Sequence, residues 1–230
     1  KLTETVHRSF HSWLDARKQN RFDRFRSDLN DLVQLKREEA EILGYRHHPY
    51  DALLNDHDKG CTVPLLESVF DGIRDPLRKL LAQIGNKEDS GDHLLRQHFP
   101  RQQQWDFGMR VLRDLGYNFE AGRQDISEHP FTVNFSNSDV RITTRIDEND
   151  LGNMTWSCIR DLGHALYEQG LPGEGYGLPS GEPVSFSIHE SQSRLWENHV
   201  GRSLAFCQHY LPVLQSIFPE QLGNADAETL

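Results

Sequence analysis

The chain has 230 residues, and its 35 Asp and Glu residues outnumber its 25 Lys and Arg residues, which gives a formal net charge of −10. This balance argues against nucleic-acid binding and against an anionic membrane surface, because both interactions depend on clustered positive charge. No apolar run approaches the roughly 20 residues of a membrane span. The three cysteines lie far apart, as is typical of reduced thiols. We therefore expect a soluble, cytoplasmic protein.

Helical periodicity dominates the first half of the chain. Apolar residues over 29–43 recur at helical spacing and end at Gly44, and those over 105–115 end at Gly116. Pro76 lies inside the strongest apolar stripe, so it should kink that helix or begin a second one. We expect this stripe to lie in the core; it consists of Leu66, Val69, Phe70, Ile73, Leu77, Leu80, Leu81 and Ile84.

The convincing β signal lies in the second half. Apolar and polar residues alternate over 131–135, Asn137 and Ser138 can form a turn, and 140–145 is rich in β-branched residues, which predicts an antiparallel hairpin. The remaining segments predict a helix over 155–169 ended by Gly170, a loop over 171–183 and a long helix over 184–210. We find no repeat or linker and expect a single α-rich domain over residues 1–230.

The residues that suggest chemistry lie on these last two predicted helices. Arg160 and His164 are one helical turn apart and face the same way. Zinc peptidases place two His at this spacing, a Glu beside the first as general base, and a third ligand on a later helix. Here Glu190 could be the third ligand, but an Arg and a His one turn apart are also an ordinary helix pair. The spacing by itself does not choose between these interpretations.

Longer motifs give a stronger signal, and they follow one another across nearly the whole chain. The motifs are Ala16-Arg17 with residues 20–22, LKREEA at 35–40, PYDALL at 49–54, HPFT at 129–132, DVRITTR at 139–145, HALYEQG at 164–170 and HESQSRLWEN at 189–198. With these motifs the chain resembles the carboxypeptidase Taq family of zinc metallocarboxypeptidases. The resemblance implies a mainly α, metallopeptidase-like fold in which the small β-hairpin lines a groove.

The resemblance also assigns roles to individual residues. His164 and Glu190 would be remnant zinc ligands, and Asp161 would occupy the general-base position. The substrate-binding candidates are His129, Asp139, Arg141 and His189. Arg141 could bind a carboxylate or simply pair with Asp139, and His189 and Glu190, adjacent on a helix, are not expected to serve one compact metal shell.

The chain departs from the family pattern at the metal site. Where the family has HExxH, Arg160 replaces the first His, and its guanidinium cannot be deprotonated to bind a metal. Asp161 replaces the Glu and is one methylene shorter. The family's chain is also about twice as long, with an N-terminal helical portion and two later motifs, IRxxAD and GxxQDxHW, that are absent here. We therefore expect no bound cofactor in this chain, although the family uses zinc or another divalent metal.

Three hypotheses follow. The chain is an inactive member that binds peptide C-termini, assembles with other chains or regulates an intact relative; or it is an active metal-dependent carboxypeptidase in which His129 or His189 supplies a replacement ligand; or it is a helical interaction module. We expect a homodimer or a complex with a complementary chain, because the apolar stripes need more cover than a half-sized domain provides. In the first hypothesis, Arg160 should lie in or beside the vacated metal position and pair with Glu190, or with Asp161 if the helix turns it inward. Arg194 is a competing partner for Glu190.

Overall fold

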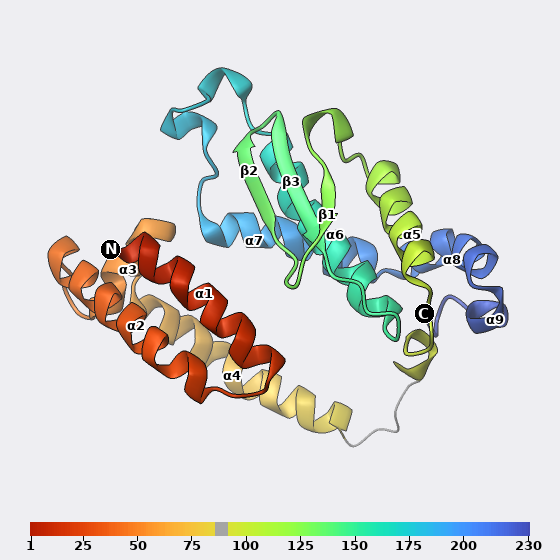
Figure 1. Ribbon diagram of the computed structural model, residues 1–230, viewed down its shortest axis with the longest axis horizontal. Coiled ribbons are helices and arrows are strands. Elements are labelled where there is room, and N and C mark those ends of the chain that lie inside the picture. The colour runs from red at the N-terminus through yellow and green to blue at the C-terminus, as the bar shows by residue number, and fades with distance from the viewer. Residues whose placement is uncertain (86–91) are drawn as a thin grey trace. The chain divides into compact units, whose positions relative to one another are not determined.

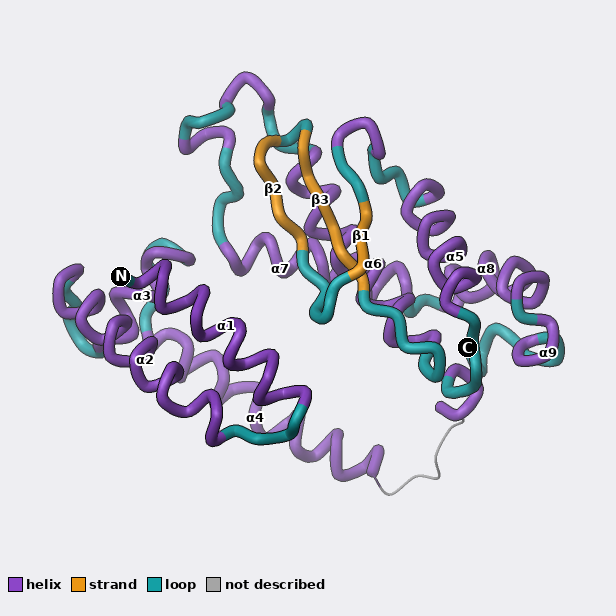
Figure 2. The backbone as a smooth tube through the Cα atoms, viewed as in Figure 1, coloured by secondary structure: helices purple, strands orange, loops and turns teal. Residues whose placement is uncertain are grey.

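The computed structural model describes residues 1–85 and 92–230, and these divide into two compact units, Lys1–Ile84 (unit 1) and Gly85–Leu230 (unit 2). Helices dominate both units, and the strands described form one three-stranded sheet (Figures 1 and 2). The mainly α fold with a small β element is therefore confirmed. Among the helices in the described part of the chain, none is long and apolar enough to cross a membrane.

Unit 1 consists of four helices, of which α1 packs on α2 and α2 on α3. As expected, α2 ends at Gly44, which has a φ of 78°. His48 precedes the third helix, and its side chain caps that helix by accepting a hydrogen bond from the Tyr50 N–H. The helices are α1 (Leu2–Lys18), α2 (Asp23–Leu43), α3 (Pro49–His57) and α4 (Val63–Gly85).

The expectation that the apolar stripe of α4 lies in the core is wrong. No residue of α4 is buried, and seven of the eight stripe side chains, from Val69 to Ile84, are 50–58% exposed. Periodicity correctly predicts a helix with one apolar face, but burial also needs a second surface against that face. The helix does not restart at Pro76 and continues through it as one element.

Unit 2 places its sheet beside a long central helix, α6, which packs against β2 and β3 (Figure 1). Helices α5 and α7 and the π-helix that follows α7 also pack on α6. The elements are α5 (Arg101–Asp114), β1 (Gln124–Ile126), β2 (Thr132–Ser136), β3 (Asp139–Thr144), α6 (Leu151–Gln169), α7 (Phe186–Arg194), a π-helix (Leu195–Gly201), α8 (Leu204–Ile217) and α9 (Pro219–Leu222), with short 3-10 turns at Asp92–Leu95, Phe119–Ala121, Gly173–Gly175 and Pro179–Gly181.

The sheet confirms the predicted hairpin and adds a strand. Strands β2 and β3 are antiparallel, with Val133 opposite Arg141 and an irregularity between Asn134 and Ser136. The sequence did not predict β1, which pairs in parallel with β3 on its other edge, so the order is β1-β3-β2. Three residues are too few to show a period of two, and the parallel pairing was fixed only by the tertiary structure.

The core of unit 2 lies around α6. Four of its side chains, Met154, Cys158, Ile159 and Leu162, are no more than 2% exposed, and they pack with Phe107 and other apolar residues of α5, β3, α8 and α9. The helix starts four residues before the expected position because the Asp150 side chain accepts a hydrogen bond from the Asn153 N–H. This cap and the buried apolar face fix α6 rigidly under the sheet.

The predicted continuous helix over 184–210 is wrong. Two serine caps divide this stretch: the hydroxyl of Ser185 accepts from the Ile188 N–H at the start of α7, and that of Ser203 accepts from the Phe206 N–H at the start of α8. Between them lies the π-helix, and Ser203 itself has extended backbone angles. A serine can cap a helix or lie inside one, so the apolar pattern alone did not reveal the break.

Candidate functional site

The candidate site lies where α6 and α7 approach each other closely, and Gly163 allows this approach. A Cβ atom at Gly163 would lie 2.7 Å from Ser193 Cα and 2.8 Å from the Gln192 carbonyl oxygen, both on α7. No side chain fits at those distances. The glycine therefore lets residues one turn apart on α6 reach the first turns of α7.

Arg160 and Glu190 form an ion pair between the two helices. The Arg160 Nη2 atom donates hydrogen bonds to both carboxylate oxygens of Glu190, at 2.8 and 3.0 Å. Arg194 Nε also donates to Glu190, at 2.9 Å, and the Ser193 hydroxyl donates at 3.0 Å. Burial would raise the pKa of Glu190, but the hydrogen bonds from Arg160 and Ser193 outweigh it and lower that pKa. The expected pair is confirmed, and Arg194 shares the same carboxylate.

His164 connects this ion pair to a second, more buried set of polar side chains. Its Nε2 atom lies 3.2 Å from Glu190 Oε2, and its Nδ1 atom lies 2.6 Å from His189 Nδ1. His189 Nε2 in turn lies 2.7 Å from Oε1 of the buried Glu168, whose other oxygen accepts from the Asn134 amide of β2 at 2.8 Å. Glu190 and His189 therefore contact opposite ring nitrogens of His164.

Burial makes the charged form of His164 unfavourable, with a smaller contribution from His189, and lowers the pKa of His164 to about 4. At neutral pH the imidazole is therefore uncharged and carries one N–H. Because the ionised Glu190 can only accept hydrogen bonds, that N–H is at Nε2, and His189 donates to Nδ1. The arrangement holds one fixed tautomer of His164 between two partners.

Asp161 is buried on α6 next to Arg160, but the two side chains point in different directions. Burial raises the pKa of Asp161 to about 7, although the charge of Arg160 partly opposes this effect. Its Oδ2 atom is buried and has no hydrogen-bond partner among the described residues. A carboxyl group in this environment is half protonated near neutral pH.

The structure does not bring the other predicted residues into this cluster. On β3, Arg141 donates two hydrogen bonds of 2.8 Å to Asp139 and lies 5.0 Å over the Phe135 ring. His129 is exposed before β2, with Nδ1 2.7 Å from the Pro130 carbonyl oxygen. In residues 1–85 and 92–230 we find no hydrogen bond or ion pair that joins these three side chains to Glu190 or His164. Their substrate-binding role remains a prediction.

Sequence reasoning missed Glu168 and Asn134. Glu168 lies one helical turn after His164, within the HALYEQG motif, and this spacing could have indicated a shared face. Asn134 gave no signal, because only the pairing of β2 with β3 brings it over α6. The Arg194–Glu190 pair extends further to Glu197 and Arg202, and Glu197 lies in the π-helix, a feature frequent at functional sites.

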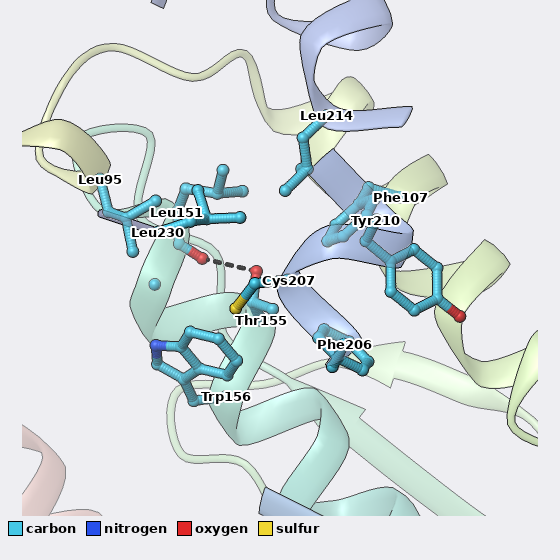
Figure 3. A pocket seen from close by; sticks show the side chains of 11 residues that line it. Leu95, Phe107, Leu151, Thr155, Trp156, Phe206, Cys207, Tyr210, Leu214 and Leu230 are labelled. Carbon is cyan, nitrogen blue, oxygen red and sulfur yellow. Dashed lines mark hydrogen bonds between the residues drawn. The ribbon is translucent and has the colours of Figure 1, made fainter. Parts of the chain in front are cut away.

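A separate apolar hollow of unit 2 offers no alternative site. Figure 3 shows side chains of α5, α6 and α8 around it, with Phe107, Trp156 and Tyr210 among them. Its volume is about 20 Å³, which is about the space of one water molecule. The nearby Thr155 hydroxyl donates to the Leu151 carbonyl oxygen, so it offers no free donor to a ligand.

The arrangement of the site defines a class of protein. One helix presents positions 160, 161 and 164, a second helix presents Glu190, and a small sheet packs on the first, which is the layout of a helical metallopeptidase. The family model of the carboxypeptidase Taq (M32) metallopeptidases matches residues 1–230, and the chain belongs to that family.

Curated relatives and solved structures agree with this assignment. The chain is 34% identical to carboxypeptidase 1 of Bacillus subtilis over 216 residues and 37% identical to thermostable carboxypeptidase 1 of Thermus thermophilus over 227 residues. Among solved structures, one described as "The Structure of CHT" is 52% identical with a TM-score of 0.86, and the "BsuCP Crystal Structure" is 31% identical with a TM-score of 0.94.

The matches cover nearly all of this chain but less than half of each relative. They span 93–94% of the chain and 43–44% of the two curated proteins, and 98–100% of the chain and 46% of the two solved structures.

The residues at the site do not fit a catalytic zinc ion. Such an ion needs three protein ligands, and here a guanidinium occupies the position of the first. That guanidinium is hydrogen-bonded to Glu190, which the family pattern makes a predicted ligand, and His164 Nε2 also faces the same carboxylate. Zinc binding would require Arg160 to leave Glu190, and it would bring a dication beside Arg194, which contacts the same carboxylate.

Proposed function

We propose that this chain is part of an M32 carboxypeptidase-like protein in which Arg160 takes the place of the metal ion and no zinc-dependent peptide hydrolysis occurs. The observation that carries the proposal is the contact between Arg160 Nη2 and both oxygens of Glu190. In a zinc peptidase these oxygens would face the metal, and here they already hold a permanent cation.

Electrostatics support this interpretation. Removing a dication from beside a partly buried carboxylate leaves an unpaired charge, which costs several kcal/mol unless another cation or a proton replaces it. Arg160 and Arg194 provide this charge at hydrogen-bond distance.

A site of this kind is suited to binding, assembly or regulation. The fold around the sheet and α6 is retained, so we propose that the protein binds peptide C-termini or modulates an intact M32 enzyme in the cytoplasm. The chain spans less than half the length of these relatives. We therefore extend the proposal, that zinc-dependent peptide hydrolysis does not occur, to any longer protein that contains these residues.

Metal content and turnover test the proposal directly. Purified protein should contain no stoichiometric zinc by elemental analysis and should release no C-terminal residue from blocked dipeptides, with or without added Zn²⁺. The rival hypothesis, an active enzyme with His129 or His189 as a replacement ligand, predicts one tight metal per chain and turnover that a chelator abolishes. That result would overturn the proposal.

A gain-of-binding variant tests the geometry. In the double variant Arg160→His and Asp161→Glu, a second imidazole should join His164 and Glu190, and we expect the affinity for Zn²⁺ to rise at least tenfold by calorimetry. The matched control, Asp71→Glu with Arg74→His, makes the same pair of changes in an exposed ion pair on α4 and should show no gain. Equal zinc affinity in the two variants would mean that α6 and α7 do not form a metal-site frame.

A further inference from the structure

Two histidines of α1 lie one helical turn apart and face the solvent. Among the 12 His of the sequence, His7 and His11 are the pair with this spacing. Both side chains are exposed, and their ring centroids are 4.8 Å apart. Within residues 1–85 and 92–230, these rings contact each other and Phe10, and no ring nitrogen of the pair forms a hydrogen bond or ion pair. The nitrogens are therefore available to a ligand.

The packing of α1 keeps this histidine pair on the side away from α2. Helix α1 packs on α2 (Figure 1), and its buried residues are Thr5, Ser9 and Ala16. At about 100° per residue, His7 and His11 lie on roughly the opposite side of the helix from these three. An ion can therefore reach both imidazoles without disturbing the contact between the two helices.

The charges around the pair favour a cation. Glu4 and Asp15 lie one turn before and one turn after the pair, on the same face of α1. The cation nearest in sequence is Arg8, and its guanidinium donates hydrogen bonds to two carboxylates of α2. The positive charge of Arg8 is thus balanced by carboxylates, whereas two negative charges flank the imidazoles.

We propose that His7 and His11 chelate a late transition-metal dication, with Cu²⁺ bound most tightly. Imidazole is a preferred ligand of Cu²⁺, Ni²⁺ and Zn²⁺, and Cu²⁺ has the highest affinity in this series. Metal–nitrogen bonds of about 2.0 Å place the centroids of two imidazoles on one ion roughly 4.5–5.2 Å apart. The separation of 4.8 Å lies within this range, so the pair is already spaced for chelation.

The chelate has two protein ligands. Among the described residues, no group of three or more His, Cys, Asp or Glu side chains is placed to hold a metal ion, so water completes the coordination. Such a site binds Zn²⁺ more weakly than Cu²⁺ and lacks the three ligands of a catalytic zinc ion. The proposal concerns unit 1 and does not depend on whether the Glu190 site binds zinc.

Calorimetric titration with Cu²⁺, in the presence of glycine as a weak competitor, tests the proposal. The parent chain should bind one Cu²⁺ at its tightest site, and the double variant His7→Ala with His11→Ala should bind it at least tenfold more weakly. The matched control, His199→Ala with His209→Ala, also removes two exposed histidines, but these lie ten residues apart. The control should keep the affinity of the parent.

A second variant tests the spacing without changing the composition. Val6→His with His7→Val moves one imidazole by one residue between exposed positions, so it no longer shares a face with His11. This variant should keep the melting temperature of the parent and lose Cu²⁺ affinity as the double alanine variant does. Electron paramagnetic resonance should show nitrogen coupling to Cu²⁺ in the parent and its loss in both variants.

Two results would overturn the proposal. Equal Cu²⁺ affinity of the parent and the double alanine variant would mean that the ion binds elsewhere, His164 and Glu190 included. Equal affinity of the parent and the variant with the moved imidazole, or an equal loss in the control, would mean that scattered imidazoles bind the ion and that the helical spacing has no role.

Discussion

The two units of this protein contain similar helices, but the apolar faces of these helices are buried in unit 2 and exposed in unit 1. In unit 2, Phe107 and Leu162 are at most 1% exposed, within a core that joins helices and strands distant in sequence. In unit 1, Phe70 is 51% exposed on α4, although the apolar stripe of α4 is more pronounced than those of α5 and α6. The comparison teaches that periodicity identifies the face of a helix, whereas burial depends on what the rest of the chain places against it.

The difference has a structural origin. Unit 2 surrounds α6 with a sheet on one side and with α5 and α8 on others, so each apolar face meets another. Unit 1 joins α1 to α2 through small residues and exposed ion pairs, such as that of Arg8 with Asp28 and Asp31. Unit 2 should therefore account for most of the measurable stability of the chain.

Truncation of one phenylalanine in each unit should give the largest effect. Phe107→Ala should lower the free energy of unfolding by about 3–5 kcal/mol, the usual cost of deleting a buried ring. Phe70→Ala should change it by less than about 1 kcal/mol, because the ring is already half in water. Urea unfolding of both variants measures this difference. Equal losses would show that the stripe of α4 is buried in solution.

The pH dependence of stability should reveal two titratable groups of unit 2 whose pKa values are shifted by burial. The pKa of Asp161 is raised to about 7 in the folded state, so between about pH 4 and 7 the folded chain binds more protons than the unfolded chain, and this group makes stability fall as pH rises. The pKa of His164 is lowered to about 4, so between about pH 4 and 6.5 it makes stability rise with pH. In the parent the two slopes oppose each other.

Single variants should separate the two slopes. Asp161→Asn should leave a stability that rises from pH 4 to 6.5, and His164→Gln one that falls from pH 4 to 7, each by up to about 3–4 kcal/mol. Urea midpoints at four pH values measure this. Hydrogen exchange should show that the amides whose protection changes with pH lie in unit 2. Similar pH profiles of stability for the parent and the two variants would contradict the burial of these side chains.

We expect the smallest difference in stability between the two units for variants of arginines whose side chains join two helices. Arg160→Met should lower stability by about 1–2 kcal/mol, a value reduced for partial exposure, because it removes the cation of α6 that pairs with Glu190. Arg8→Met, which removes two contacts made by a largely exposed side chain between α1 and α2, should leave the urea midpoint unchanged. A larger loss for Arg8→Met would reverse the comparison between the units.

Particular elements show where sequence reasoning succeeded. The hairpin was predictable because alternation and a turn occur together over residues 131–145, and the end of α2 because Gly44 adopts a positive φ. The pairing of Arg160 with Glu190 was predictable because a family motif placed both residues at one site. The break before α8 and the strand β1 were not, since a capping serine and three residues of backbone carry little periodic signal.

The sequence by itself determined the family, the helical character, the hairpin and the presence of an arginine where the family pattern has its first His, because these depend on residue identity and local spacing. Only the tertiary structure decided that His189 and Glu190 meet opposite nitrogens of His164, that Glu168 and Asn134 join them, and that the stripe of α4 lies uncovered. These features depend on which surfaces approach one another over long sequence separations. A pattern within one helix contains no information about its neighbour.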